Sequence, residues 1–217
     1  MTDPVLVNSQ YQYCRIPDDI YRQSFVTVRE EANLSGMSAG EQAVAIRLIH
    51  ACGMVDIIDD LELSHRAVET GADALARGCS IFCDVEMVRS GIIEGRLPAH
   101  NPIVCTLNDG RVPGHAKHIT NTRSAAAVDY WGDDLGGSIV VIGNAPTALF
   151  RLLERLDDGA PKPALVIGIP VGFVGAVESK QALANYSSDL PFITVHGRRG
   201  GSAMASATLN ALAGGLS

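Results

Sequence analysis

The chain has 217 residues, of which 47% are hydrophobic and 19% charged, with 22 glycines and 10 prolines. This composition is typical of a globular domain with many tight turns, and it excludes disorder, collagen-like repeats and a coiled coil. The net charge of −7 argues against nucleic acid or an anionic membrane as the main partner. We expect a single domain over 1–217, with an irregular N-terminal tail over 1–12.

Cysteine usage and the first residues predict where the protein works. There are five cysteines, and an odd number argues against a framework of disulfides. The first residues, MTDPVLVNSQ, lack the basic start and apolar run of a secretory segment. No apolar stretch approaches the roughly 20 residues that a transmembrane helix needs. These features predict free thiols, no membrane span and a cytoplasmic location.

Three helices are expected before residue 80. The first runs from a cap at Asp18 or Asp19 to about residue 31. It should turn Ile20, Phe25 and Val28 toward the core.

The second and third helices have clear start signals. Ser38 and Glu41 form a Ser-x-x-Glu capping box at the start of the second. Ser64 should begin the third. The apolar stripe expected on the third helix consists of Ala67, Val68, Ala72, Leu75 and Ala76.

Beyond residue 80 the pattern changes to strands. Short apolar runs stand at 80–83, 103–105, 139–142, 164–169 and 192–195. The last three are continuous, as in strands that are covered on both faces, and segments of helical period separate them. We therefore predict a three-layer α/β/α fold with about five parallel strands, preceded by a helical N-terminal part.

Glycine-rich loops follow the last three predicted strands, at 143–147, 170–175 and 197–202. Ligands of such sheets bind outside the carboxyl ends of the strands, where free amides can hold an anion. None of the loops spells the dinucleotide fingerprint or the P-loop. A nucleotide-dependent oxidoreductase therefore has only the general fold in its favour.

Two other motifs have simpler explanations than catalysis or metal binding. Gly36-Met37-Ser38-Ala39-Gly40 matches the hydrolase G-x-S-x-G elbow, but a helix precedes it and the capping box already accounts for Ser38. His115 with His118, and Cys79 with Cys83, lack the second half of a structural zinc site. We expect no metal.

Arginine and histidine pairs are the more informative signals. Arg47 and His50 share one face of the second helix, where the cation can hold a substrate carboxylate while the imidazole exchanges a proton. Arg123 stands at a helix start, the unfavourable end of the dipole, so a bound anion would explain it. An exposed loop arginine is the equally simple alternative for Arg123.

Together, five segments resemble the precorrin-8X methylmutase family of cobalamin biosynthesis, and the resemblance spans about residues 13–213. The segments are IHACG at 49–53, NTRSAA at 121–126, GNAPTALFRLLE at 143–154, PVGFVGAVESK at 170–180 and GRRGGSA at 197–203. The third and fourth are long and specific.

The resemblance implies a flavodoxin-like fold and a homodimer. It also implies an isomerase that moves a methyl group from carbon 11 to carbon 12 of precorrin-8X, giving hydrogenobyrinate. Such a rearrangement is intramolecular, so we expect no metal, nucleotide or redox cofactor.

The same resemblance implies roles for individual residues. The motif histidine, a proton donor and acceptor, carries over to His50, and substrate contacts carry over to Ser24, Arg47 and Arg123. Because precorrin-8X is fringed with carboxylates, cations and amides in the matching segments complete the expected substrate-binding set. These further residues are Ser124, Asn144, Gly172, Lys180 and Arg198.

Two alternatives stay open within this interpretation. A related branch acts on cobalt-precorrin-8, although Ala51-Cys52-Gly53 and the segment 83–87 are more similar to the cobalt-free branch. A tetrapyrrole carrier without catalytic activity would bind the pigment and release it unchanged.

Overall fold

A computed structural model describes residues 11, 13–187 and 189–214. Apart from residue 11, the predicted tail over 1–12 lies outside the described residues. The centre of the fold is a six-stranded sheet with the order β1-β6-β5-β4-β2-β3. Its strands are β1 Leu61–Leu63, β2 Ile81–Cys83, β3 Ile103–Val104, β4 Ile139–Ile142, β5 Leu165–Gly168 and β6 Phe192–Val195.

The five predicted strands are confirmed and pair in parallel. Counted from β2, the first of them along the chain, their order is 2-1-3-4-5, which is the flavodoxin-like doubly wound arrangement. β1 was not predicted. It adds to the edge of β6 in antiparallel register, with Leu61 opposite Val195, and three residues are too few to show a period.

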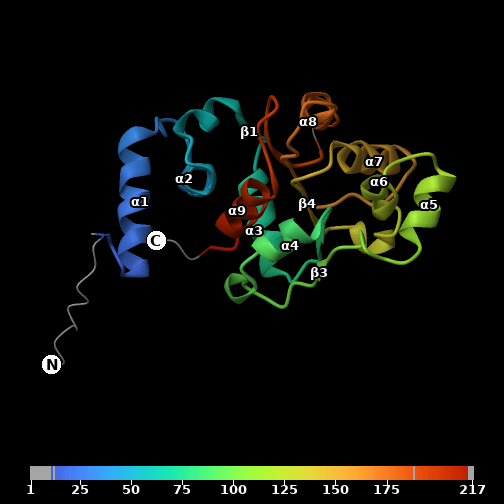
Figure 1. The fold of residues 1–217 in the computed structure, drawn as a ribbon, viewed down its shortest axis with the longest axis horizontal. Helices are drawn as coiled ribbons and strands as arrows, with labels where there is room; N and C mark the ends of the chain where they lie inside the picture. The colour runs from blue at the N-terminus through green and yellow to red at the C-terminus, as the bar shows by residue number, and fades with distance from the viewer. Residues whose placement is uncertain (1–10, 12, 188, 215–217) are drawn as a thin grey trace.

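Helices cover both faces of the sheet, as Figure 1 shows, so the predicted three layers are confirmed. Alternate residues of β4 face opposite cores. Ile139 and Val141 pack in one cluster with Leu209, whereas Val140 and Ile142 pack in the other with leucines of α7. This double burial explains the continuous apolar run that the strand shows in sequence.

One face carries α2, α3, α4 and α9, and the other carries α6, α7 and α8, with α5 packed on α6. The bounds are α1 Pro17–Glu31, α2 Ala39–Cys52, α3 Ala67–Ala76, α4 Glu86–Gly91, α5 Val112–His118, α6 Arg123–Val128, α7 Pro146–Asp157, α8 Ala176–Ala184 and α9 Ser202–Leu212. Three short 3₁₀ helices are η1 Val55–Asp60, η2 Glu94–Arg96 and η3 Gly132–Leu135. No helix within the described ranges is long and apolar enough to cross a membrane.

The two N-terminal helices form as expected, with one difference. The capping box at the start of α2 is present, because Ser38 N–H donates to Glu41 and Glu41 N–H donates to the Ser38 hydroxyl. On α1, Phe25 and Val28 are buried, but Ile20 is 46% exposed, so its predicted core position is wrong. α1 packs mainly on α2 at one end of the molecule (Figure 1), and most of its residues are exposed.

The third helix starts later than predicted, at Ala67 rather than Ser64. Ser64 instead extends the edge pairing of β1, because its amide and hydroxyl both bond the backbone of Phe192. Ala76, predicted on the apolar stripe, is exposed on the last turn. Gly71 is buried in its place, close to Leu165 of the sheet.

Candidate functional site

The C-terminal turn of α2 presents His50 to the N-terminal helix. His50 Nδ1 lies 2.7 Å from the Ser24 hydroxyl of α1. The rings of Phe25 and Tyr21, also on α1, lie 5.3 and 5.5 Å from the imidazole, centroid to centroid. α1 therefore fixes the orientation of the ring through one hydrogen bond and two ring contacts.

A serine partner permits either protonation pattern of the neutral imidazole. The Ser24 hydroxyl can accept from Nδ1–H, which leaves Nε2 as a base, or it can donate to Nδ1, which leaves Nε2–H as a hydrogen-bond donor. Burial, and then the charge of Arg47, lower the pKa of His50. The neutral form is therefore favoured at neutral pH.

Arg47 lies one turn before His50 on α2 and is only 6% exposed. Its Nη2 is buried, and it has no hydrogen-bond partner among the residues that the structure describes. Burial and the nearby charge of Arg96 lower the pKa of Arg47. A buried guanidinium without an anion is costly, so this side chain is suited to receive one.

Two cavities meet at Arg47 and Asn210. One, of about 460 Å³, contains His50 and is bordered by α2, α4, α9 and the loop before α9. The other, of about 410 Å³, lies between α1, α2 and the end of α9, and includes Phe25 and Gln42. The predicted pair of Arg47 and His50 therefore faces ligand-sized space.

The last glycine loop reaches this site directly. Gly201, Ser202 and Ala203 border the cavity of His50, next to Met87 and Gly91 from the segment after β2. The structure thus brings two of the resembling segments, IHACG and GRRGGSA, together around one cavity.

Two of the expected substrate-binding residues hold the glycine loop over 197–202 by donating hydrogen bonds to its backbone carbonyls. Gly172 donates its amide to the Arg198 carbonyl at 3.2 Å, and Lys180 Nζ donates to the Arg199 carbonyl at 2.8 Å. Lys180 is fully buried, and burial lowers its pKa to about 8. Lys180 therefore has a partner inside the chain, and does not border either cavity.

The two arginines of that loop also have partners within the chain. Arg198 is exposed and lies over the Phe173 ring, 5.4 Å from its centroid. Arg199 forms ion pairs with Asp56 and Asp60 at 2.7 and 2.6 Å.

The loop after β4 holds an anion that belongs to the protein. The buried Asp84 carboxylate accepts the amides of Gly143, Asn144 and Ala145 at 3.1, 2.9 and 2.8 Å. Burial raises the pKa of Asp84, opposed by these three bonds. The amides expected to bind a ligand in this loop are therefore already bonded, while the Asn144 side chain remains exposed.

Arg123 and Ser124 lie on α6, far from α1 and α2 (Figure 1). Thr122 caps α6 by accepting the Ala125 amide at 3.1 Å. The exposed Arg123 side chain donates to the Leu107 carbonyl at 3.1 Å. In one chain the structure does not bring these residues to His50.

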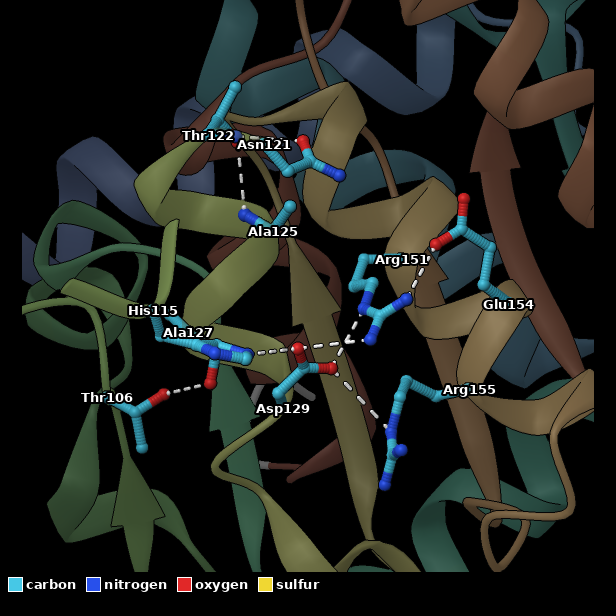
Figure 2. A network of polar contacts seen from close by, with 10 residues as sticks. All are labelled: Thr106, His115, Asn121, Thr122, Ala125, Ala127, Asp129, Arg151, Glu154 and Arg155. Carbon is cyan, nitrogen blue, oxygen red and sulfur yellow. Dashed lines mark hydrogen bonds and ion pairs between the residues drawn. The ribbon is translucent and has the colours of Figure 1, made fainter. Parts of the chain in front are cut away.

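Beside α6, Asp129 is the centre of a polar network that includes His115 (Figure 2). Its carboxylate accepts from His115 Nε2 at 2.6 Å and from two nitrogens of Arg151 at 2.8 and 3.1 Å. Within the described part of the chain, no three His, Cys, Asp or Glu residues are grouped as a metal site. Through the shared Asp129 carboxylate, His115 links α5 to the end of α6 and to Arg151 of α7.

Sequence reasoning missed three residues of the site. Asp84 lies in the segment 83–87, which was noted only for its similarity to the cobalt-free branch, and Arg96 and Asn210 stand in segments with no motif. Only the tertiary structure brings Asp84 to the loop after β4 and Asn210 to the cavity of Arg47. A lone Asp directly after a buried strand is the one signal that points to Asp84.

Comparison with known proteins identifies the family of the chain. The chain matches the family described as Precorrin-8X methylmutase over residues 19–214. It is 58% identical to a precorrin-8X methylmutase of Pseudomonas aeruginosa, covering 93% of this chain and 97% of that protein. It is 38% identical to a cobalt-precorrin-8 methylmutase of Salmonella typhimurium, covering 92% and 96%.

A solved structure described as precorrin-8X methyl mutase from Thermus thermophilus superposes with a TM-score of 0.80. Its sequence is 38% identical, and the match covers 89% of this chain and 95% of that one. Fold and matches together define the class of protein as a methyl-migrating isomerase. Within that class, the chain belongs to the precorrin-8X methylmutase family.

Proposed function

We propose that this protein moves the methyl group of precorrin-8X from carbon 11 to carbon 12, giving hydrogenobyrinate in cobalamin biosynthesis. The observation that carries the proposal is the His50–Ser24 pair beside a cavity that Arg47 also lines, with its buried Nη2 lacking a partner among the described residues. Substrate and product of the rearrangement are isomers, so the step balances without an oxidant or reductant.

His50 is the proposed proton donor and acceptor. By protonating the macrocycle it would draw electron density from the ring system and ease the methyl shift, after which it recovers the proton. Ser24 would keep the imidazole in place in both protonation states. Arg47 would bind a peripheral carboxylate and so set the position of the ring relative to Nε2.

The remaining substrate-binding predictions belong to the outer part of the site. Arg198 and Gly172 are proposed to contact peripheral carboxylates, which is supported by the bond between their loops and by the position of Gly201 and Ser202, a few residues after Arg198, at the His50 cavity. Arg123 and Ser124 are proposed contacts on α6, which lies away from His50 within one chain. Asn144 is a proposed contact through its exposed side chain in the loop after β4. Lys180 is proposed to act indirectly on substrate binding. It donates a hydrogen bond to the Arg199 carbonyl and so holds the loop that contains Arg198.

The cobalt-free macrocycle is the proposed substrate. The chain is 58% and 53% identical to two precorrin-8X methylmutases, but 34% to 38% identical to the cobalt-precorrin-8 methylmutases it resembles. The similarity of Ala51-Cys52-Gly53 and 83–87 to the cobalt-free branch points the same way.

We also propose that the protein works as a homodimer in the cytoplasm. Phe173 is 86% exposed and Val174 89% exposed, beside the half-exposed Val171, and such a patch on a short loop is suited to a second copy of the chain. All five cysteines are free thiols, which agrees with a reducing compartment.

Conversion assays with purified protein test the proposed function. Incubation with precorrin-8X should produce the visible spectrum of hydrogenobyrinate, and cobalt-precorrin-8 should be converted more slowly. His50→Asn should reduce turnover by roughly 10²- to 10⁴-fold while hydrogenobyrinate still binds. Binding without conversion by the unmodified protein would instead identify a carrier, and full turnover in the variant would remove His50 from the mechanism.

A further inference from the structure

The first turn of α9 carries hydrogen-bond donors that no described group of the protein uses. Gly201 caps this 11-residue helix and has no side chain that could accept a hydrogen bond. The amides of Ser202, Ala203 and Met204 lack a partner among the described residues, and the first amide to bond is that of Ala205, which donates to the Gly201 carbonyl at 3.0 Å. Three N–H groups are therefore left at the end of the helix where the dipole is positive.

Ser202 adds a fourth donor to this turn. Its side-chain oxygen is buried and has no hydrogen-bond partner in the described part of the chain, and the whole residue is only 9% exposed. Buried hydroxyl groups usually have a partner, because a lone one destabilises the folded state. Ser206, one turn further along, shows the usual arrangement, since its hydroxyl donates to the Ser202 carbonyl at 2.9 Å. The Ser202 hydroxyl is therefore available to a ligand.

The start of α9 lies at the cavity of His50. Gly201, Ser202 and Ala203 border this cavity, together with Arg47 and His50 of α2. A Cβ atom added at Gly201 would meet no atom within 4 Å, so no described group covers the helix start there. Among the described residues, no acidic side chain borders the cavity, and Arg47 is its one permanently charged group. Arg47 and the helix dipole together give the cavity a positive potential that suits an anionic group.

We propose that the first turn of α9 is a carboxylate subsite, in which the Ser202 hydroxyl and the amides of Ser202 and Ala203 bind one acidic side chain of the macrocycle. The subsite rests on the proposed function, and neither the resemblance nor the family match gives Ser202 a role. One carboxylate can accept hydrogen bonds from a hydroxyl and from the amides of a helix start together. Arg47 borders the same cavity from α2, so with a second carboxylate on Arg47 the macrocycle would be fixed at two points beside His50.

The experiment measures the affinity for hydrogenobyrinate by absorbance titration. Ser202→Ala removes only the hydroxyl, and the affinity should fall roughly ten- to a hundredfold, the range for one hydrogen bond to a charged group. Ser138→Ala is the matched control. Ser138 is also buried, but it stands directly before β4, at the other end of the strands, where its hydroxyl donates to the Leu135 carbonyl. This control should bind hydrogenobyrinate as the unmodified protein does.

Thermal unfolding of the free protein separates binding from structure. The Ser138 hydroxyl has a partner, so its loss should lower the unfolding midpoint by about 2–4 °C. The Ser202 hydroxyl has none among the described residues, so Ser202→Ala should leave the midpoint unchanged or raise it by about 2–4 °C. Weaker affinity in a protein of undiminished stability identifies a binding group.

A second pair of variants tests the helix start, whose amides cannot be removed by substitution. Ala203 is exposed on the first turn of α9, so Ala203→Asp places a negative charge beside the subsite without entering the core. The added charge interacts favourably with the helix dipole but repels a carboxylate. Ala203→Asn has nearly the same shape without the charge, and it should bind hydrogenobyrinate roughly tenfold more tightly than Ala203→Asp. If Ser202→Ala fails to fold, this pair tests the subsite.

Unchanged affinity of Ser202→Ala, with normal conversion by the unmodified protein, overturns the subsite and leaves the proposed function intact. Equal affinity of Ala203→Asp and Ala203→Asn also overturns it, because no carboxylate would then lie at the helix start. A lower unfolding midpoint in Ser202→Ala would assign the hydroxyl a structural role and count against the subsite. If the unmodified protein neither binds hydrogenobyrinate nor converts precorrin-8X, the proposed function fails and the subsite with it.

Discussion

Burial and the Arg47 charge both lower the pKa of His50, and the two causes have different consequences. Burial penalises the imidazolium in every state of the protein, whereas Arg47 repels it only until an anion neutralises the guanidinium. A bound substrate carboxylate would therefore make protonation of His50 easier at the moment when the proton is needed. In this arrangement, the residue that we propose as a substrate contact would also tune the proposed acid.

The effect of Arg47 on His50 can be measured directly. Replacing Arg47 with Met removes a nearby positive charge, so the pKa of His50 should rise toward its usual value of about 6.5. The ring would then stay protonated to a higher pH than in the unmodified protein. An NMR titration gives this value, with the His50 signal assigned by its loss in His50→Asn.

Arg77→Met, at an exposed position at the end of α3, serves as the control and should leave the His50 titration unchanged. If Arg47→Met leaves the pKa of His50 where it was, burial alone lowers it, and the coupling between substrate binding and protonation is wrong.

Among single residues, the position of a side chain was predicted best where two reactive side chains lie on the same helix. Arg47 and His50 lie three apart on a helix with unambiguous start signals, so their common face follows from helical geometry. Arg96 and Asn210 could not be found this way, because their neighbourhood depends on how α9 packs against the segment after α4. Lys180 is the opposite case, a cation whose motif suggested a ligand and whose buried nitrogen meets a carbonyl.

At the level of elements, the loop after β4 depends on the strand beside it. Asp84 follows β2, and its carboxylate bonds three consecutive amides at the start of α7. β2 and β4 are neighbours in the sheet, and the strand order reverses between them, so this contact joins the two halves of the doubly wound fold. The glycine-rich pattern predicted free amides that would bind a ligand at this loop, but these amides already donate to the Asp84 carboxylate.

Asp84→Asn tests the importance of that contact, because it keeps the shape but replaces one acceptor oxygen with an NH₂ group. At least one backbone amide would lose its partner, so the free energy of unfolding should fall by about 2–4 kcal/mol. Urea unfolding measures the loss, and hydrogen exchange should show faster exchange of the amides of 143–145.

Asp73→Asn, on the exposed side of α3, provides the comparison and should change stability by less than about 0.5 kcal/mol. Equal stability of the two variants would show that Asp84 does not hold the loop.

Helices and strands could be predicted from sequence where the segment was long enough to show a hydrophobic pattern. The five parallel strands are continuous or nearly continuous apolar runs because helices cover both faces. β1 and the delayed start of α3 escaped prediction for one shared reason. Ser64 resembles a helix cap, but pairing of the short edge strand with Phe192 uses its polar groups first.

For the whole molecule, net charge describes the substrate site poorly. The protein is acidic, and residues 161–217 hold four basic and two acidic side chains, which suggested that this segment attracts a polycarboxylate. In the structure, Lys162 and Arg199 form ion pairs with aspartates, and Lys180 bonds a carbonyl. Of the four basic side chains, only Arg198 is left exposed without an ion pair among the described residues. Buried guanidinium nitrogens that lack a partner in the described part of the chain belong instead to Arg47 and Arg96, in the acidic part of the sequence.

Assembly is the last property that the surface predicts. Phe173 and Val174 are 86% and 89% exposed, and their loop continues into Gly175 and α8, next to the loop that borders the His50 cavity. In a twofold dimer, both copies of a residue on the shared surface are buried. Each Phe side chain withdrawn from water contributes about 1.5–3 kcal/mol to the free energy of association. Phe173→Ser should therefore convert a dimer of 22.9 kDa chains into monomer at micromolar concentration, as light scattering after size exclusion would show.

Val26→Ser, at an exposed apolar position on α1, should leave the mass unchanged. A dimer that survives Phe173→Ser would place the interface elsewhere, and a monomeric unmodified protein would remove the dimer from the proposal.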